Sequence, residues 1–344
     1  MTWLEQNHPG AYEGYRYSSK HPGPLSIPEE LHYNHWIADR SIDFIGNQVS
    51  APSPQPFFLW CSFPDPHEPF AAVREWSDFY EDAGITLPAH TLALSPLNRS
   101  ETMTRMGKGT EVYDPDWIRE CIRQTYGMIS HVDEQVGRVL AVLENQGLMD
   151  DTIIMFISDH GDQLGEHGFL YKMDYPYNAH MHVPFVARVP GGVQGHVVED
   201  VVSQIDLVPT VLALAGVSHP DDLCRAALRP GQANIPPALP GEVLAPVLRT
   251  GARPERRNAL VEHDTVDAAF GNVQMRTLVT NDFKLVYYTP LQETMLFDRR
   301  NDPDERVNLA GDPAHQPVVM AMLKALLAEL ARTEMPAHLL STGA

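Results

Sequence analysis

An apolar strand that runs straight into a polar, glycine-punctuated turn constrains this chain more than any other feature. The segment Thr152–Ile157 predicts a buried strand, and the run SDHGDQLGEHG follows it over Ser158–Gly168. Asp159 and His160 are therefore expected at the carboxyl end of that strand, where open α/β sheets place their ligands. A carboxylate and an imidazole on one turn can share a divalent cation, and Lys172 adds positive charge for an anionic group bound to it. The alternative is an ordinary strand-to-loop turn.

Helices and strands alternate in the prediction for the part of the chain before residue 216. Apolar residues at helical spacing predict a long helix from Asp116 to about Gln146, which leads directly into the strand at 152–157. A continuous apolar run over Phe57–Phe63 has the character of a central parallel strand. Three further elements are predicted: helices over Tyr33–Gln48 and Asp206–Ala215, and a strand over Pro184–Val189. This alternation predicts an α/β fold.

The carboxyl-terminal part of the chain predicts a smaller unit. Strand-like runs near Ala259–Glu262, Met275–Thr280 and Lys284–Tyr288 are followed by a helix from about Val318 to Arg332. We therefore expect two domains: an α/β core over residues 1–245 and an antiparallel-sheet-plus-helix subdomain over residues 246–344.

Net charge and cysteine content exclude several classes of protein. A formal charge of −20 argues against a nucleic-acid partner, because phosphate binding needs a basic face. No apolar run reaches the roughly 18 residues of a membrane helix, so we expect no membrane partner. Three scattered cysteines point to a reducing compartment, and the opening MTWLEQNHPGAYEGY lacks the basic and apolar regions of a signal peptide. We therefore expect a cytoplasmic location.

Five ordered blocks of this sequence resemble the sulfatase family of the alkaline-phosphatase-like superfamily. The SDHG and LGEHG turn with Lys172 is one block, and PFFLWCSFPDPHEPF resembles the family's strand followed by PHxPF. YGMISHVDEQVGRVLAVLENQGLMDDT resembles its helix before the metal strand. VPFVARVPG with VSQIDLVPTVLALAGV, and NDFKLVYY with LFDRRNDPDERVNLAGDP, resemble its later segments. The resemblance covers about Leu31 to Arg332. It implies an α/β fold with a mostly parallel sheet flanked by helices and a smaller carboxyl-terminal α+β subdomain.

One family block is missing from this sequence. Sulfatases carry near their amino terminus a C/S-x-P-S/A-R segment, whose Cys or Ser becomes the formylglycine that attacks sulfur, and an earlier pair of metal-binding aspartates. The contexts of Cys61, Cys121 and Cys224 do not fit this segment, no serine fits it, and no Asp-Asp pair precedes Pro56. We therefore expect a sulfatase that lacks its first βαβ portion and cannot encode formylglycine. An uncovered sheet edge favours self-association, so a homo-oligomer is among the expected partners.

The resemblance assigns roles to four residues. Asp159 and His160 match metal ligands, Lys172 matches the lysine that contacts the sulfate and the leaving oxygen, and His67 matches a histidine that touches the substrate. Each has an ordinary alternative: a strand-end turn at 159, a structural histidine at 160, a solvated lysine at 172 and a rigid PHEP turn at 67. Oxygen ligands favour calcium as the one divalent metal, whereas the nitrogen of His160 makes manganese the alternative.

Neighbouring polar residues are weaker candidates. Three residues of the turn suit supporting roles: Asp162, Glu166 and His167. His180 and His182 occupy a stretch where many relatives carry Glu and Ser, and alternating histidines also suit an exposed surface. The run Glu262–Asp264 follows a predicted strand and reaches either the rim of the site or solvent.

Three functions stay open from the sequence. The first is a metal-dependent hydrolase of sulfate monoesters, with a small anionic ester as its ligand. The second is a phosphonate monoester or phosphodiester hydrolase, because relatives with those activities share the DHG and PHxP blocks. The third is a non-catalytic protein that keeps the scaffold and half a metal site, which the absence of a nucleophile favours.

Overall fold

The computed structural model describes residues 6–15, 22–88, 100–106, 113–172, 174–218, 239–268 and 270–333. The chain divides into two compact units, each assembled from separate stretches of sequence. The first unit comprises Met1–Ala93, Val112–Thr152 and Leu164–Leu170, and the second comprises Leu94–Glu111, Ile153–Gln163 and Tyr171–Ala344. The expected domain boundary near residue 245 stays a prediction. Among the described helices, none is both long and apolar enough to span a membrane.

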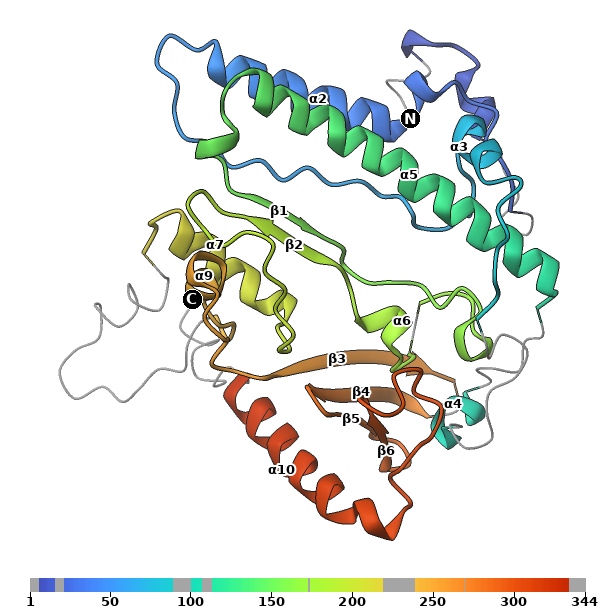
Figure 1. Ribbon diagram of the computed structural model, residues 1–344. Helices are drawn as coiled ribbons and strands as arrows, with labels where there is room; N and C mark the ends of the chain where they lie inside the picture. The colour runs from blue at the N-terminus through green and yellow to red at the C-terminus, as the bar shows by residue number, and fades with distance from the viewer. Residues whose placement is uncertain are drawn as a thin grey trace, which may run out of the picture. The chain divides into compact units, whose positions relative to one another are not determined.

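The first unit is built around two long helices that lie side by side, α2 (Tyr33–Val49) and α5 (Pro115–Asn145) (Figure 1). Asp114 caps α5, because its carboxylate accepts hydrogen bonds from the N–H groups of Asp116 at 2.9 Å and Trp117 at 3.1 Å. A proline follows at the first helical position, where a missing N–H is harmless. The helices expected over 33–48 and 116–146 are therefore confirmed.

Shorter elements complete the first unit: η1 (Ala11–Tyr15), η2 (Glu29–Leu31), α3 (Arg74–Phe79), η4 (Met149–Asp151) and η5 (Glu166–Gly168). Helix α3 packs closely on α5 at Gly127. A Cβ atom there would lie 2.8 Å from the Cβ of Ala72 and 3.1 Å from the backbone oxygen of Trp76. Glycine at position 127 thus allows the two helices to approach.

The prediction of a strand over Phe57–Phe63 is wrong. Among the described residues, this segment is part of no strand. Phe57 makes an edge contact with Phe44 of α2, with 5.7 Å between ring centroids. Phe58 and Trp60 point away and are 69% and 71% exposed. A strand is defined by hydrogen bonds to a neighbour, and none of the described strands pairs with this apolar run.

The second unit contains a two-stranded ladder. Strands β1 (Ile154–Ile157) and β2 (Phe185–Arg188) confirm the strands expected near 152–157 and 184–189. They pair antiparallel, with Ile154 opposite Arg188 and Ile157 opposite Phe185. We expected parallel pairing in this region, but these two strands pair antiparallel. The chain leaves β1 through the polar turn and returns through α6 (Asn178–Met181), so that β2 runs in the opposite direction.

Between β2 and the carboxyl-terminal sheet, the described residues of the second unit form three helical elements: η6 (Gln204–Asp206), α7 (Leu207–Leu214) and α9 (Ala245–Thr250). A short helix, α4 (Glu101–Arg105), also belongs to it. Ser203 and Asp206 form a capping box at the start of η6, which begins the helix expected over 206–215. Asp206 is buried, pairs with Arg256 and accepts a 2.8 Å hydrogen bond from Glu242 N–H.

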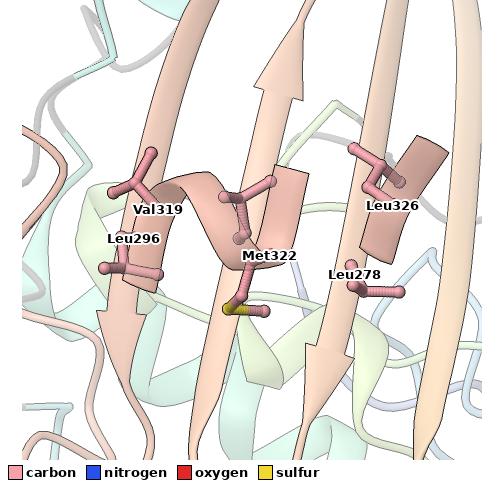
Figure 2. Packing of buried hydrophobic residues seen from close by; sticks show 6 residues of the cluster. Leu278, Leu296, Val319, Met322 and Leu326 are labelled. Carbon is pink, nitrogen blue, oxygen red and sulfur yellow. The ribbon is translucent and has the colours of Figure 1, made fainter. Parts of the chain in front are cut away.

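The carboxyl-terminal part of the second unit is a four-stranded antiparallel sheet covered by a helix. The strands are β3 (Asn258–Asp267), β4 (Gly271–Thr280), β5 (Phe283–Tyr288) and β6 (Glu293–Asp298), in the order β3-β4-β5-β6. Helix α10 (Gln316–Thr333) places Val319, Met322 and Leu326 against Leu278 and Leu296 of the sheet (Figure 2). Burying each such side chain contributes about 1.5–3 kcal/mol, so this contact fixes the sheet and helix together.

Candidate functional site

The turn after β1 presents the expected carboxylate and imidazole side by side. Nε2 of His160 lies 3.8 Å from Oδ2 of Asp159, whose side chain is 85% exposed. Oγ of Ser158 donates a 2.9 Å hydrogen bond to the backbone oxygen of His160. The amide of Gln204 donates hydrogen bonds of 2.7 Å to the backbone oxygens of both Ser158 and Asp159. The turn is therefore held through its main chain, which leaves the Asp159 carboxylate accessible.

Gly161 brings this turn against α6. Its N–H donates a 2.9 Å hydrogen bond to the backbone oxygen of His180. A Cβ atom at position 161 would lie 2.0 Å from the backbone oxygen of Ala179, a distance that no side chain can tolerate. The close approach places the rings of His160 and His180 edge to face, 5.5 Å apart between centroids. The glycine of the DHG run is thus required by packing.

The charge states of these groups follow from their surroundings. Burial raises the pKa of Asp159, but the 2.8 Å hydrogen bond from His160 N–H and the adjacent imidazole outweigh burial and hold that pKa below its usual value. Burial lowers the pKa of His180, and electrostatic interactions with His160, His263 and Lys172 lower it further. At neutral pH the site therefore combines an ionised Asp159 with an uncharged His180.

Lys172 is positioned through its backbone. Its N–H donates a 2.9 Å hydrogen bond to Oδ1 of Asp162, so Asp162 has the supporting role expected of it. Nearby in sequence, Oδ1 of Asp174 lies 2.9 Å from Nε2 of His263 on β3, and the hydroxyl of Tyr288 on β5 donates to the backbone oxygen of Asp174 at 2.8 Å. The carboxyl-terminal sheet therefore holds the segment that follows Lys172.

A buried ion pair fixes α6 from the same sheet. Lys284 of β5 pairs with Glu305, and both side chains are almost completely buried. Nζ of Lys284 also donates to the backbone oxygen of Pro176 at 2.9 Å and to Oδ1 of Asn178 at 2.7 Å. Oε2 of Glu305 accepts a 2.7 Å hydrogen bond from Asn178 N–H. The sequence reasoning missed this pair, and its only local signal is a lysine inside the apolar run FKLVYY.

The other candidates lie apart from the Asp159 turn or have different partners. His67 belongs to the first unit and is 52% exposed, with Nδ1 2.6 Å from the backbone oxygen of Glu68. Its convergence with Asp159 and Lys172 stays a prediction. His167 is buried in η5 of the first unit. His182 is exposed at the end of α6.

The polar run Glu262–Asp264, which follows the strand predicted near residue 259, now lies within β3, and its side chains have two kinds of partner. Glu262 and Asp264 both pair with Arg276 of the neighbouring strand β4. His263, between them, is directed to Asp174 instead. Of this run, His263 alone therefore contributes to the surroundings of the Asp159 turn, through its effect on His180.

Asp159 and His160 fit two positions of a divalent metal site. Nδ1 of His160 lies 2.9 Å from the backbone oxygen of Gly161, and a hydrogen bond donated there leaves the Nε2 lone pair free for a cation. The ionised carboxylate of Asp159 supplies an oxygen ligand. Within the described part of the chain, no further histidine, cysteine or carboxylate completes a three-ligand group with this pair. The turn therefore offers two ligand atoms, and the metal site stays a prediction.

Comparisons with known proteins agree on one family. The sulfatase family model matches residues 3–217, and the model of the N-sulphoglucosamine sulphohydrolase carboxyl-terminal region matches residues 222–333. An arylsulfatase of Clostridium perfringens is 28% identical over 315 residues, covering 89% of this chain. An uncharacterized sulfatase of Escherichia coli is 30% identical over 306 residues, covering 88% of this chain. The chain spans 60% and 56% of the lengths of these two relatives.

Solved structures agree with the sequence comparison. A phosphonate monoester hydrolase from Silicibacter pomeroyi aligns with a TM-score of 0.75 and 26% identity, covering 97% of this chain and 70% of that structure. The phosphonate monoester hydrolase of Agrobacterium radiobacter aligns with a TM-score of 0.70 and 26% identity, covering 96% of this chain and 68% of that one. These alignments confirm the expected alkaline-phosphatase-like α/β fold class.

Proposed function

Because this chain belongs to the sulfatase family, we propose that its Asp159 turn and Lys172 bind the metal and the anionic group in the hydrolysis of sulfate monoesters. The observation that carries the proposal is the pairing of an accessible, ionised Asp159 with His160, 3.8 Å apart, on a turn fixed by its main chain. The proposed ligand is a small ester with one negative charge on its sulfate group.

The side chains divide the work of binding. Asp159 and His160 would hold the divalent cation, calcium by the preference of oxygen ligands and manganese as the alternative. When bound, the cation supplies positive charge to the non-bridging oxygens of the ester. Lys172, whose backbone Asp162 fixes, supplies a second positive charge for the same group. An uncharged His180 beside His160 adds no further positive charge to repel the cation.

The nucleophile is not assigned to any residue of this sequence. Its three cysteines do not fit the C/S-x-P-S/A-R pattern, and the curated relatives are longer than this chain. His67 is proposed as a substrate contact, supported by the PHEP run and by the exposure of its ring.

A second candidate is the hydrolysis of phosphonate monoesters. Two phosphonate monoester hydrolases align over 97% and 96% of this chain, each with 26% identity. A phosphonate monoester also carries one negative charge on a tetrahedral centre, so the same cation and lysine suit it. The choice between the two therefore depends on relative affinity.

Anion binding by the 344-residue protein tests the proposal. Inorganic sulfate and 4-nitrophenyl sulfate are titrated calorimetrically into the calcium-loaded chain, its Lys172→Ala and Asp159→Asn variants, and Lys324→Ala as an exposed control. We expect Lys172→Ala to weaken sulfate binding about tenfold or more, because a hydrogen bond to a charged group contributes about 1.5–3 kcal/mol. Asp159→Asn should abolish the calcium dependence.

Two results decide between the candidates. Sulfate bound equally well by wild type, Lys172→Ala and Asp159→Asn would refute the proposed site. Displacement of 4-nitrophenyl sulfate by a phenylphosphonate monoester at much lower concentration than by inorganic sulfate would favour the second candidate.

A further inference from the structure

A second group of metal-ligating side chains lies inside the first unit. His32 precedes α2, Asp65 lies in the loop before His67, and His131 is in the middle of α5. All three are buried, and one ligand atom from each lies within 4.8 Å of the others. We propose that His32, Asp65 and His131 bind one zinc ion.

Two buried polar atoms at this cluster have no hydrogen-bond partner. They are Nε2 of His32, a residue that is 1% exposed, and Oδ1 of Asn34, which is completely buried. The ring of His32 lies 4.8 Å from that of His131 between centroids, and one of its two nitrogens is among the ligand atoms of the cluster. A buried polar atom is normally paired, and a bound cation would give Nε2 of His32 a partner, with a cation-bound water for Oδ1 of Asn34.

His131 is oriented as a metal-binding histidine. Its Nε2 lies 2.9 Å from Oε1 of Glu29, and a proton shared with that carboxylate leaves the lone pair on Nδ1. The contact of Nδ1 with Nδ2 of Asn34 is long, at 3.4 Å. Glu29 is itself held in place, because Nδ1 of His35 lies 2.9 Å and Nε2 of Gln135 lies 2.8 Å from the same carboxylate. The carboxylate–histidine pair thus directs Nδ1 into the cluster.

The ligand types suit zinc. Two imidazole nitrogens and one carboxylate oxygen are a common zinc set, and a water completes four ligands. Nδ2 of Asn34, which donates to Oδ2 of Asp65 at 2.8 Å, would give up that contact to the ion. Asp65 and Glu29 together offer two negative charges to balance the two positive charges of the ion. Tetrahedral zinc holds its ligand atoms about 3.3 Å apart, so the cluster would contract by at most about 1.5 Å.

Binding through Nε2 of His32 requires one proton to move. Nδ1 of His32 accepts a long, 3.3 Å hydrogen bond from Asn34 N–H, so the neutral ring carries its proton on Nε2. On binding, the proton moves to Nδ1 and no proton is released, so the Nδ1–H and the Asn34 N–H, now 3.3 Å apart, must separate. The zinc would tie α2, α5 and the loop of Asp65 together, and this loop continues into His67.

Zinc retention by a chain without a polyhistidine tag tests the proposal. The protein is stripped with a chelator, dialysed against buffered zinc, and its bound zinc and melting temperature are measured. We expect one tightly held zinc ion per chain and a higher melting temperature with zinc. Replacement by cobalt should give the visible absorption of a tetrahedral nitrogen–oxygen site.

Matched variants locate the ion. His32→Gln and His131→Gln should lose the zinc and the cobalt absorption, whereas Asp159→Ala and His167→Asn should keep both. His167 is buried like His32, and its φ of 54° suits asparagine. A folded wild-type chain that retains no zinc would overturn the proposal and leave a water between His32 and Asn34. Zinc retained equally by folded His32→Gln, or lost in Asp159→Ala, would also overturn it.

Discussion

Replacing Lys284 with methionine isolates the free energy held in the buried ion pair that fixes α6. The change removes the positive charge but keeps a long apolar side chain. It leaves the Glu305 carboxylate in a site that is 1% exposed, and it removes the donor to the backbone of Pro176 and to Asn178. Removing one partner of a buried pair costs about 3–5 kcal/mol, because the remaining charge has no compensation.

Proton uptake by the orphaned carboxylate limits the part of this loss that comes from its charge. A glutamic carboxyl titrates near 4.3 in water, so keeping it protonated in the folded state costs about 3.7 kcal/mol at pH 7 and about 1 kcal/mol at pH 5. Lower pH favours the protonated, folded form of the variant. The destabilisation of Lys284→Met relative to wild type should therefore shrink by about 2.7 kcal/mol between pH 7 and pH 5.

The assay must report on the second unit. All five tryptophans, at positions 3, 36, 60, 76 and 117, belong to the first unit, so their fluorescence is the wrong probe. Hydrogen exchange of peptides from β3–β6, followed by mass spectrometry in urea, reports on the sheet that carries Lys284. Lys324→Met, an exposed lysine of α10, should change stability by no more than about 0.5 kcal/mol.

A double variant separates charge from packing. Lys284→Met combined with Glu305→Met removes both charges, so its stability relative to wild type should not depend on pH between 5 and 7. If Lys284→Met alone shows a loss below about 1 kcal/mol at pH 7, or a loss that grows as the pH falls, the reasoning about the pair is refuted.

Three further predictions concern the candidate site. Calcium or manganese should bind weakly at the Asp159 turn and not at all after Asp159→Ala, as measured by calorimetry; micromolar or tighter binding that survives the substitution would exclude this site. Gly161→Ala should destabilise the second unit by about 2–4 kcal/mol through overpacking and loss of the His180 hydrogen bond, whereas Gly137→Ala, in open space on α5, should be neutral or stabilising in urea unfolding. The 344-residue chain alone should release no 4-nitrophenol from 4-nitrophenyl sulfate. A water molecule that no side chain positions lacks the lowering of the activation barrier, up to about 7–11 kcal/mol, that a well-oriented nucleophile gains from proximity. Turnover that disappears in Cys61→Ala would contradict this.

The sequence predicted those elements whose signals are local. The extent of α5 follows from apolar spacing, and β1 and β2 follow from short apolar runs. The run Phe57–Phe63 has the same local signal but pairs with none of the described strands, and pairing is not a local property. Strand β6 was missed because its apolar core of Met295–Phe297 is only three residues long.

The candidate site also contains residues with a local sequence signal and partners that only the fold reveals. Asp159, His160 and Lys172 could be predicted together as site residues because they lie within one stretch of sequence. The partners that fix them come from far away along the chain: Gln204 holds the turn, and Lys284 holds α6. Chemical type could be read from the sequence at these positions, whereas the hydrogen-bond partners required the folded chain.

The interleaving of the two units has a consequence for handling the protein. The chain passes between the units five times, because their stretches alternate along the sequence. No single proteolytic cut, and no choice of one expression boundary, separates the chain into two pieces that each contain a whole unit. The seven residues Leu164–Leu170 belong to the first unit, while the flanking Asp159 and Lys172 belong to the second. A single proteolytic cut within Leu164–Leu170 would therefore leave Asp159 and Lys172 on different fragments, although both residues belong to the second unit.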